Sequence, residues 1–203
     1  MPIEFVEKGH KYYKDGVEIP SVSELTRFIS KEIYGNANLE AAEAAKERGT
    51  LVHAATEEMD RIGSVEVPDY LEGYLMAYAR FISDYKPFWW MSEEIVYSEN
   101  WNYAGRVDRF GTLKTGENIL LDIKTTKRIG KKEKVLYSTQ LGFYDMAIKE
   151  MSEHKIDGIA ILKLSENGTY KLINVEPHRG LMRACYQLHE SLNTKKKIKD
   201  YIA

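Results

Sequence analysis

The segment Ile119-Leu120-Leu121-Asp122-Ile123-Lys124 constrains the fold of this chain more than any other. Its apolar residues are typical of a strand buried in a sheet, yet an acid and a lysine stand two positions apart at its end. Side chains at positions i and i+2 of a strand point to the same face, so Asp122 and Lys124 are expected side by side. Because burying either charge alone is costly, the two need water, a metal ion or each other.

A second acid precedes this strand. Asp108 ends the short run Gly105-Arg106-Val107-Asp108, and the segment that joins it to Asp122 is typical of a hairpin connection. Two carboxylates on paired strands form a site for a hard divalent cation such as Mg²⁺ or Mn²⁺. With a lysine beside them to orient or polarise water, they provide the groups that metal-assisted phosphodiester hydrolysis requires.

The remaining pattern predicts an α/β fold in which a central mixed β-sheet is flanked by helices. Strands are expected over residues 89–98, 103–113, 119–125, 158–164 and 170–175, with shorter ones at 4–6, 11–13 and 17–19. Helices are expected to start at Ser21, with Glu24 completing a capping box, and to cover 39–62, 69–86, 135–151 and the residues from about 177. The 203 residues suit one domain with three parts: an N-terminal hairpin and helices (1–87), a sheet core carrying the site (88–176) and a C-terminal helix (177–203).

Four short motifs follow one another along the chain: Gly49-x-x-x-His53, Gly105-x-x-Asp108, Asp122-x-Lys124 and Gln140-x-x-x-Tyr144. In this order and spacing they resemble the PD-(D/E)xK nuclease superfamily, and more narrowly its RecB-like and phage-exonuclease branch. The segment from His10 to Ser23 also resembles the opening of phage-encoded members. The resemblance covers the chain from about residue 10 to about residue 150 and implies a restriction-endonuclease-like core. Val107 stands where the family name has proline, a substitution that the RecB-like branch tolerates.

The resemblance also implies roles for individual residues. His53, Asp108 and Asp122 are expected to bind the cation, with the backbone carbonyl of Ile123 completing the protein ligands. Lys124 is expected to orient the attacking water or to stabilise charge on the phosphate. A simpler structural interpretation stays open for each of them, because a helix histidine is often a core residue and a strand-end acid–lysine pair is often an exposed ion pair.

Three further pairs of residues have the same double interpretation. The family often has a glutamate on the strand over 89–98, and Glu94 is slightly preferred to Glu93, although the pattern does not choose between them and both fit a solvated edge. Gln140 and Tyr144 are implied to support Lys124 and a substrate phosphate, or they belong to a core-facing helix stripe. A mid-helix glycine costs about 1 kcal/mol relative to alanine, so Gly49 suggests a close contact on the helix face that carries His53.

Charge and composition limit the remaining functions. The net charge of −2 is not that of a passive DNA-coating protein, but a local basic stretch is expected to hold the DNA backbone, namely Lys127, Arg128, Lys131 and Lys132. Cys185 is the single cysteine, so these 203 residues form no internal disulfide and cannot supply the roughly four thiolates of an iron–sulfur cluster. No apolar run reaches the roughly 18–20 residues of a membrane span, and the first residues do not resemble a signal peptide, which favours a bacterial or phage-infected host cytoplasm.

The sequence therefore predicts a Mg²⁺- or Mn²⁺-dependent deoxyribonuclease, most similar to phage-type or RecB-like DNA exonucleases that act in recombination or repair. DNA is the expected partner, and no base-reading motif is visible. A single-strand annealing or recombination protein, and self-association into a homo-oligomer, are left open as further partners. Two alternatives remain: a structure-selective or nicking endonuclease with the same site, and an inactive DNA-binding protein with the nuclease fold.

Overall fold

The apolar run that begins at Ile119 forms the central strand of a five-stranded sheet. The structure, a computed structural model, describes residues 3–202, with side chains described as far as residue 193. In spatial order the sheet consists of β4 (Phe88–Ser98), β5 (Tyr103–Thr112), β6 (Asn118–Lys124), β7 (Gly158–Leu164) and β8 (Tyr170–Asn174). Only β6 and β7 are parallel among the neighbours in this sheet, so the expected mixed sheet is confirmed.

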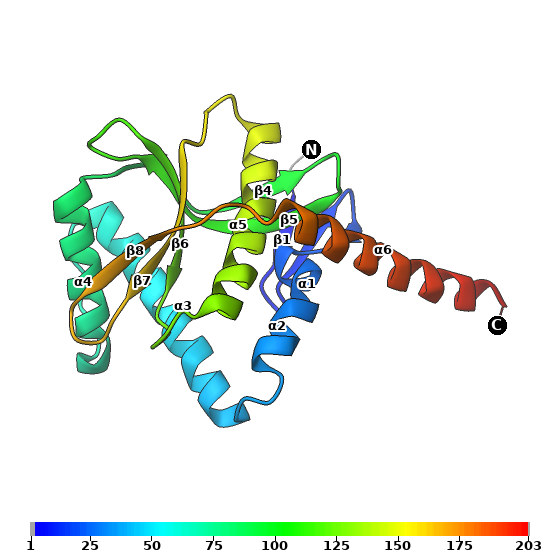
Figure 1. The fold of residues 1–203 in the computed structure, drawn as a ribbon, viewed down its shortest axis with the longest axis horizontal. Coiled ribbons are helices and arrows are strands. Elements are labelled where there is room, and N and C mark those ends of the chain that lie inside the picture. The colour runs from blue at the N-terminus through cyan, green and yellow to red at the C-terminus, as the bar shows by residue number, and fades with distance from the viewer. Residues whose placement is uncertain (1–2, 203) are drawn as a thin grey trace.

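Helices cover both faces of this sheet (Figure 1). Alternate residues of β6 divide between two cores, because Ile119, Leu121 and Ile123 pack with residues of two helices on one face, α3 (Leu39–Ile62) and α4 (Asp69–Tyr85). Leu120 belongs to the core on the other face, which contains residues of α1 (Val22–Leu25), α5 (Lys131–Met151) and α6 (Arg179–Ile202). The helix α2 (Arg27–Tyr34) lies next to α5. The C-terminal end of β6, which carries Asp122 and Lys124, therefore lies between α3 and α5.

Local sequence signals set most helix ends. Ser21 and Glu24 form the predicted capping box at the start of α1, and Asn38 caps α3 by accepting the N–H of Ala41. At its other end α3 stops at Gly63, which has a φ of 84° and can adopt the left-handed conformation without steric cost.

The helix α5 begins four residues earlier than predicted, at Lys131 instead of residue 135. The Glu133 carboxylate accepts the N–H of Gly130 at 2.9 Å, which satisfies one of the free donors at the helix start. Lys131 and Lys132 consequently lie in the first turn of a helix, and only Lys127 and Arg128 of the basic stretch remain in the loop after β6.

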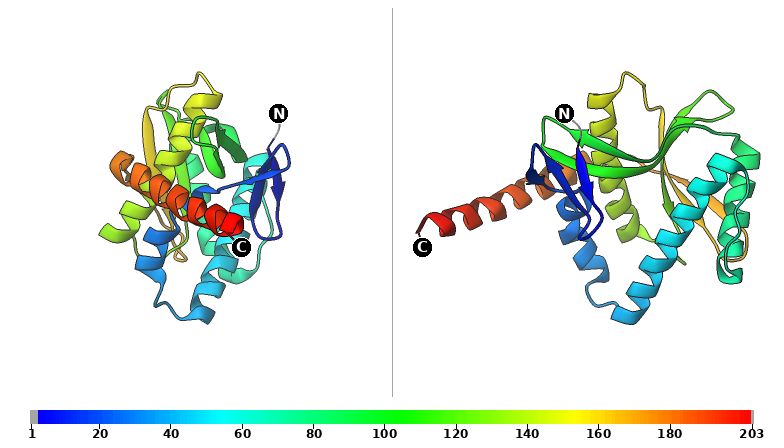
Figure 2. Two further views of the ribbon diagram at one scale, coloured as in Figure 1. Left: turned by 90° about the vertical axis from the view of Figure 1, so that its right-hand side faces the viewer. Right: turned by 180° about the vertical axis from the view of Figure 1, so that it is seen from behind.

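A second, three-stranded antiparallel sheet contains β1 (Glu4–Val6), β2 (Lys11–Lys14) and β3 (Val17–Ile19). It joins the main body through β5, because the N–H of Ala104 donates to the carbonyl of Pro20 at 3.0 Å. Views from the side and from behind show this sheet next to α1 and show α6 leading away from the rest of the molecule (Figure 2). Over the described residues, no helix has both the length and the apolar composition needed to cross a membrane.

Candidate metal centre and acid–lysine pair

The candidate site begins where β5 and β6 separate. Their ladder extends from the pair Thr112–Asn118 to the pair Arg109–Leu121. Asp108 comes next on β5, and its carboxylate Oδ2 accepts the N–H of Ile123 at 2.6 Å, in place of a backbone-to-backbone bond. This bond brings the Asp108 carboxylate onto β6 next to Asp122, as the two separate motifs predicted.

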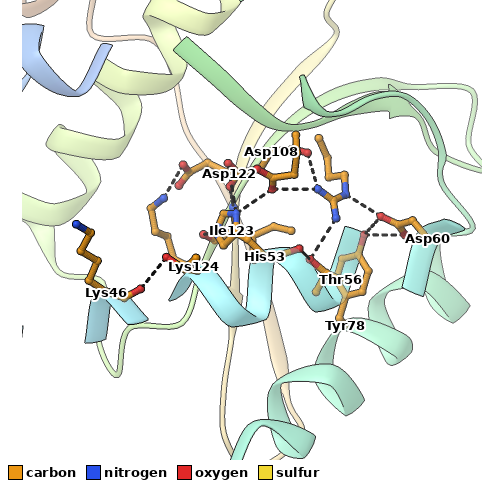
Figure 3. A network of polar contacts seen from close by, with 12 residues as sticks. Lys46, His53, Thr56, Asp60, Tyr78, Asp108, Asp122, Ile123 and Lys124 are labelled. Carbon is orange, nitrogen blue, oxygen red and sulfur yellow. Dashed lines mark hydrogen bonds and ion pairs between the residues drawn. The ribbon is translucent and has the colours of Figure 1, made fainter. Parts of the chain in front are cut away.

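His53, Glu93 and Asp108 form a compact cluster, and Figure 3 shows His53 and Asp108 of this cluster close to Ile123 on β6. The imidazole Nδ1 lies 3.0 Å from Glu93 Oε1 and 3.7 Å from Asp108 Oδ1, and Nε2 lies 3.0 Å from the carbonyl oxygen of Ile123. The ligand atoms of His53, Glu93 and Asp108 all lie within 4.8 Å of one another. Imidazole and carboxylate oxygens of this kind suit Mg²⁺ or Mn²⁺.

The glutamate of this cluster is Glu93, so the preference for Glu94 was wrong. Glu94 pairs regularly with Val107 and its side chain is exposed. Glu93 has a φ of 52°, the left-handed region, in the middle of an otherwise extended strand. That backbone conformation is costly for a residue with a side chain, and the strand pattern, which did not choose between Glu93 and Glu94, gave no sign of it.

Asp122 and Lys124 lie side by side, as the i and i+2 spacing predicted. The Lys124 ammonium is 2.6 Å from Asp122 Oδ1 and 5.0 Å from the centre of the Tyr137 ring. Asp122 is only 4% exposed, so the pair is not the exposed surface ion pair of the simpler interpretation. The second oxygen of this acid, Oδ2, is buried and has no hydrogen-bond partner among the residues that the structure describes. An unpartnered buried carboxylate oxygen is costly, and a bound cation would satisfy it.

The charges of the site perturb one another. Burial raises the pKa of Asp122 to about 6, although the neighbouring Lys124 acts in the opposite direction. Burial would lower the pKa of Lys124, but the carboxylates of Asp122 and Asp108 outweigh it and hold that pKa above its usual value. For His53, burial again opposes the charged form, yet Asp108 and the hydrogen bond to Glu93 raise the pKa to about 9. Without a metal ion, His53 therefore carries the proton that a cation would replace.

Gln140 and Tyr144 take different positions from those implied for them. Gln140 Nε2 donates to Thr26 Oγ1 at 3.4 Å, and the ring that lies under Lys124 belongs to Tyr137, two helical turns before Tyr144. The predicted support of Lys124 by Gln140 is therefore not present in this arrangement. Tyr144 lies on α5, and burial of its phenol, followed by the charges of Asp108 and Asp122, raises the pKa of that group well above its usual value.

The two glycines of the motifs, Gly49 and Gly105, differ in how much space surrounds them. A Cβ at Gly105 would lie 2.6 Å from Cε1 of Tyr144, so glycine makes room for that ring. A Cβ at Gly49 would meet no atom of the described residues within 4 Å, so the expected close contact at Gly49 is not found among them.

Sequence reasoning missed a second set of residues beside the cluster. Arg109 is fully buried and pairs with Asp60 at 2.7 Å, and Tyr78 donates to the same Asp60 carboxylate. The only signal was the charge of Arg109 next to Asp108, since Asp60 lies in an ordinary helical pattern. The basic residues of the predicted DNA-binding stretch, Lys127, Arg128, Lys131 and Lys132, are all exposed, and Lys132 lies 3.9 Å from Glu32.

Fold and site together define a mixed-sheet α/β protein with an acid–histidine cluster and an acid–lysine pair where two neighbouring strands separate. No family model matches this chain, and no curated protein matches its sequence.

Among solved structures, the chain is similar to LHK-Exo in complex with dAMP, with a TM-score of 0.44 and 13% identity over 91% of this chain and 95% of that one. It is also similar to SSO0001, with a TM-score of 0.43 and 15% identity over 84% of this chain and 72% of that one. A third similar structure is the alkaline exonuclease LHK-Exo from Laribacter hongkongensis, with a TM-score of 0.41 and 13% identity over 76% of this chain and 86% of that one. Likenesses this distant carry no argument about activity, which has to come from the residues of this chain.

Proposed function

We propose that this protein is a divalent-metal-dependent deoxyribonuclease, and more narrowly a DNA exonuclease of recombination or repair. The observation that carries the proposal is the convergence of His53, Glu93 and Asp108 within 4.8 Å, beside a buried Asp122 oxygen that has no hydrogen-bond partner in the described part of the chain. Such a cluster is costly without counter-charges, because three carboxylates share one buried region. In the metal-free protein Lys124, Arg109 and protonated His53 supply these charges, and a cation would take the place of the His53 proton. The order and spacing of the sequence motifs support the same activity.

The residues present fit Mg²⁺ or Mn²⁺. His53, Glu93, Asp108 and Asp122 would hold the cation, and the carbonyl of Ile123 lies next to the imidazole as a further oxygen donor. When bound there, such an ion neutralises charge on a phosphodiester and lowers the pKa of water. His53 has to give up its proton for this to happen, because only the neutral imidazole nitrogen binds a metal.

Lys124 has a role that its electrostatics restrict. Its pKa is held above the usual value, so the side chain stays an ammonium ion at neutral pH and does not act as a general base. The ammonium lies between the Asp122 carboxylate and the Tyr137 ring, which fixes its direction. From that position it orients the attacking water, or it stabilises the charge that develops on the phosphate in the transition state.

Binding of DNA is assigned to the basic stretch that follows β6. Lys127 and Arg128 lie in the loop directly after Lys124, and Lys131 and Lys132 lie at the start of α5, all with exposed side chains. Cationic side chains in such a place bind phosphates regardless of base sequence, which suits an exonuclease. If the same site also cleaved DNA that has no free end, the protein would instead be a nicking or structure-selective endonuclease.

Incubation of the metal-free protein with linear and covalently closed circular DNA, in Mg²⁺, in Mn²⁺ and in chelator, tests the proposal. We expect nucleotides to be released from linear DNA only, and only when a divalent cation is present. Cleavage of the closed circle would instead indicate an endonuclease. Cleavage that continues undiminished in chelator would contradict metal dependence. DNA binding without any hydrolysis would identify an inactive DNA-binding protein, and Asp122→Asn provides the inactive reference protein.

A further inference from the structure

Arg109 follows Asp108 on β5, and none of its side-chain surface is exposed. Burying a guanidinium is costly unless its donors are satisfied. Its Nε donates to Asp60 Oδ2 at 2.7 Å and its Nη2 donates to Thr56 Oγ1 at 3.1 Å. Its Nη1 donates to the carbonyl oxygen of Asp108 at 2.6 Å and lies 3.4 Å from Glu93 Oε1. One guanidinium thus connects α3 with two of the proposed metal ligands.

The acid that holds Arg109 is itself fixed. The hydroxyl of Tyr78 lies 2.7 Å and 2.9 Å from the two carboxylate oxygens of Asp60, and the Tyr78 side chain is fully buried. Thr56 and Asp60 follow His53 on α3 at spacings that place all three on one helix face. Figure 3 shows Thr56, Asp60 and Tyr78 on one side of His53 and Lys124 on the other.

Glu93 depends on this arrangement more than the other ligands do. Its backbone has a φ of 52°, a conformation that persists only where surrounding contacts hold it. Oε1 of its carboxylate faces His53 Nδ1 at 3.0 Å and Arg109 Nη1 at 3.4 Å. Arg109 therefore balances the charge of Glu93 and restricts where that carboxylate can point.

We propose that Arg109, held by Asp60, is a positioning residue that fixes the Glu93 carboxylate and the Asp108 peptide against His53 before a divalent cation binds. This inference rests on the proposed function, because it assigns Arg109 a task in the same metal centre. A residue that only fills the core would contribute to stability and leave the affinity of the folded protein for metal unchanged.

Isothermal titration of Mn²⁺ into the full-length, metal-free protein tests the proposal without any need for catalysis. Arg109→Lys is expected to weaken Mn²⁺ binding by about 10–100-fold, the range for losing an outer-shell partner of a metal ligand. A single ammonium cannot reach Asp60, Thr56 and the two ligands together, since it lacks the planar fork of the guanidinium. Asp60→Asn removes the charge that holds the guanidinium, and it should weaken binding in the same direction.

Tyr103→Phe is the matched control. It removes a buried hydroxyl, on the same strand as Arg109, that donates to the carbonyl of Phe143 at 2.7 Å. Among the described residues, no ligand of the cluster is a hydrogen-bond partner of this hydroxyl. This variant should unfold at a lower temperature and still bind Mn²⁺ as the wild type does.

The outcomes separate the two proposals. A wild-type protein that binds no Mn²⁺ would overturn the proposed function. Wild-type binding together with unchanged affinity in Arg109→Lys and Asp60→Asn would overturn the positioning role alone. Where Arg109→Lys does not fold, Asp60→Asn decides the question in the same titration.

Discussion

Glu93 and Glu94 are neighbours on β4, but only Glu93 lies beside His53, at 3.0 Å from Nδ1. This difference gives a matched pair of variants with identical chemistry. Glu93→Gln is expected to weaken Mn²⁺ binding at least as much as the loss of an outer-shell partner, which costs about 10–100-fold. Glu94→Gln should bind Mn²⁺ as the wild type does, because its side chain is exposed. Equal affinity in the two variants, measured by calorimetry, would remove Glu93 from the metal centre.

Lys124 is the residue that distinguishes an active enzyme from an inactive relative with the same fold. If its ammonium acts mainly on the transition state, Lys124→Ala should lower turnover by about 10²–10³-fold, the range for losing one electrostatic stabiliser. Affinity for DNA should change little. Lys124→Arg should restore activity only in part, because the guanidinium is larger and differently hydrated.

Lys163 supplies the control for this prediction. It pairs in register with Lys124 on β7, and its ammonium contacts Ser165 at 2.9 Å instead of an acid. Turnover should therefore survive in Lys163→Ala, measured with saturating Mn²⁺ and DNA. Full activity in Lys124→Ala would contradict the chemical role.

At the scale of single elements, replacing Gly49 or Gly105 with alanine should change the stability of the protein in opposite directions. Gly49→Ala is expected to stabilise the protein by up to about 1 kcal/mol, since alanine favours the helix and its Cβ meets no atom. Gly105→Ala is expected to destabilise it by about 1–3 kcal/mol, because the Cβ would overlap the ring of Tyr144. Denaturant unfolding in chelator measures both values. A loss of stability in Gly49→Ala would show that the α3 face is more crowded than this structure has it.

The start of α5 makes a second prediction about an element. Lys131 and Lys132 lie in the first turn, where positive charge opposes the helix dipole, so they do not contribute to helix stability. Replacing both with Ala should weaken DNA binding similarly for all sequences and flatten its salt dependence by about 0.9 log unit per lost phosphate contact. Thermal stability should not fall.

The control for this double variant has the same change in charge. Lys114 and Lys171 are exposed, and Lys114 lies in the turn between β5 and β6, at the end of these strands away from Lys124. Replacing both with Ala should leave the salt slope unchanged. A slope that stays the same in Lys131→Ala/Lys132→Ala would mean that these lysines only face solvent.

The predicted elements agree with the structure where local signals determine them. The Asn38 cap and Gly63 fix both ends of α3, and the pairing of Asp122 with Lys124 follows from strand geometry alone. Contacts between distant segments left no such signal. The left-handed backbone that turns Glu93 toward His53, and the bond from Arg109 to Asp60, depend on how α3 packs on the sheet. The slight preference for Glu94 failed for that reason, since strand spacing alone did not choose between the two glutamates.

At the scale of the whole molecule, the site is a concentration of opposite charges in the middle of the fold. Four acids lie in it, namely Asp60, Glu93, Asp108 and Asp122, and they face Arg109, Lys124 and His53. Among these three positive side chains, His53 is the one that loses its proton, and with it its charge, in an accessible pH range. Its pKa of about 9 in the folded protein exceeds the value of about 6.5 expected for the unfolded chain.

The sign of the resulting pH dependence follows from that difference. Because the folded pKa is raised, the stabilisation by the His53 proton is complete below about pH 6.5 and disappears as the pH rises through about 9. A shift of this size corresponds to about 3 kcal/mol of unfolding free energy. The raised pKa of Asp122, about 6, acts at lower pH. Its main causes are burial, Lys124 and Asp108, and the charge of His53 lowers it only as a lesser influence, so most of this effect remains in variants of His53.

Metal-free wild-type protein should therefore lose stability between pH 6.5 and 9.5, and His53→Gln should lose much less over the same range. Excess Mn²⁺ should abolish the loss in the wild type, because a cation that binds only the folded state takes the place of the proton. Thermal unfolding in chelator and in Mn²⁺, measured across this pH range for both proteins, checks the prediction. Parallel curves for wild type and His53→Gln in chelator would mean that His53 carries no extra proton, and its place among the acids would then need another cause.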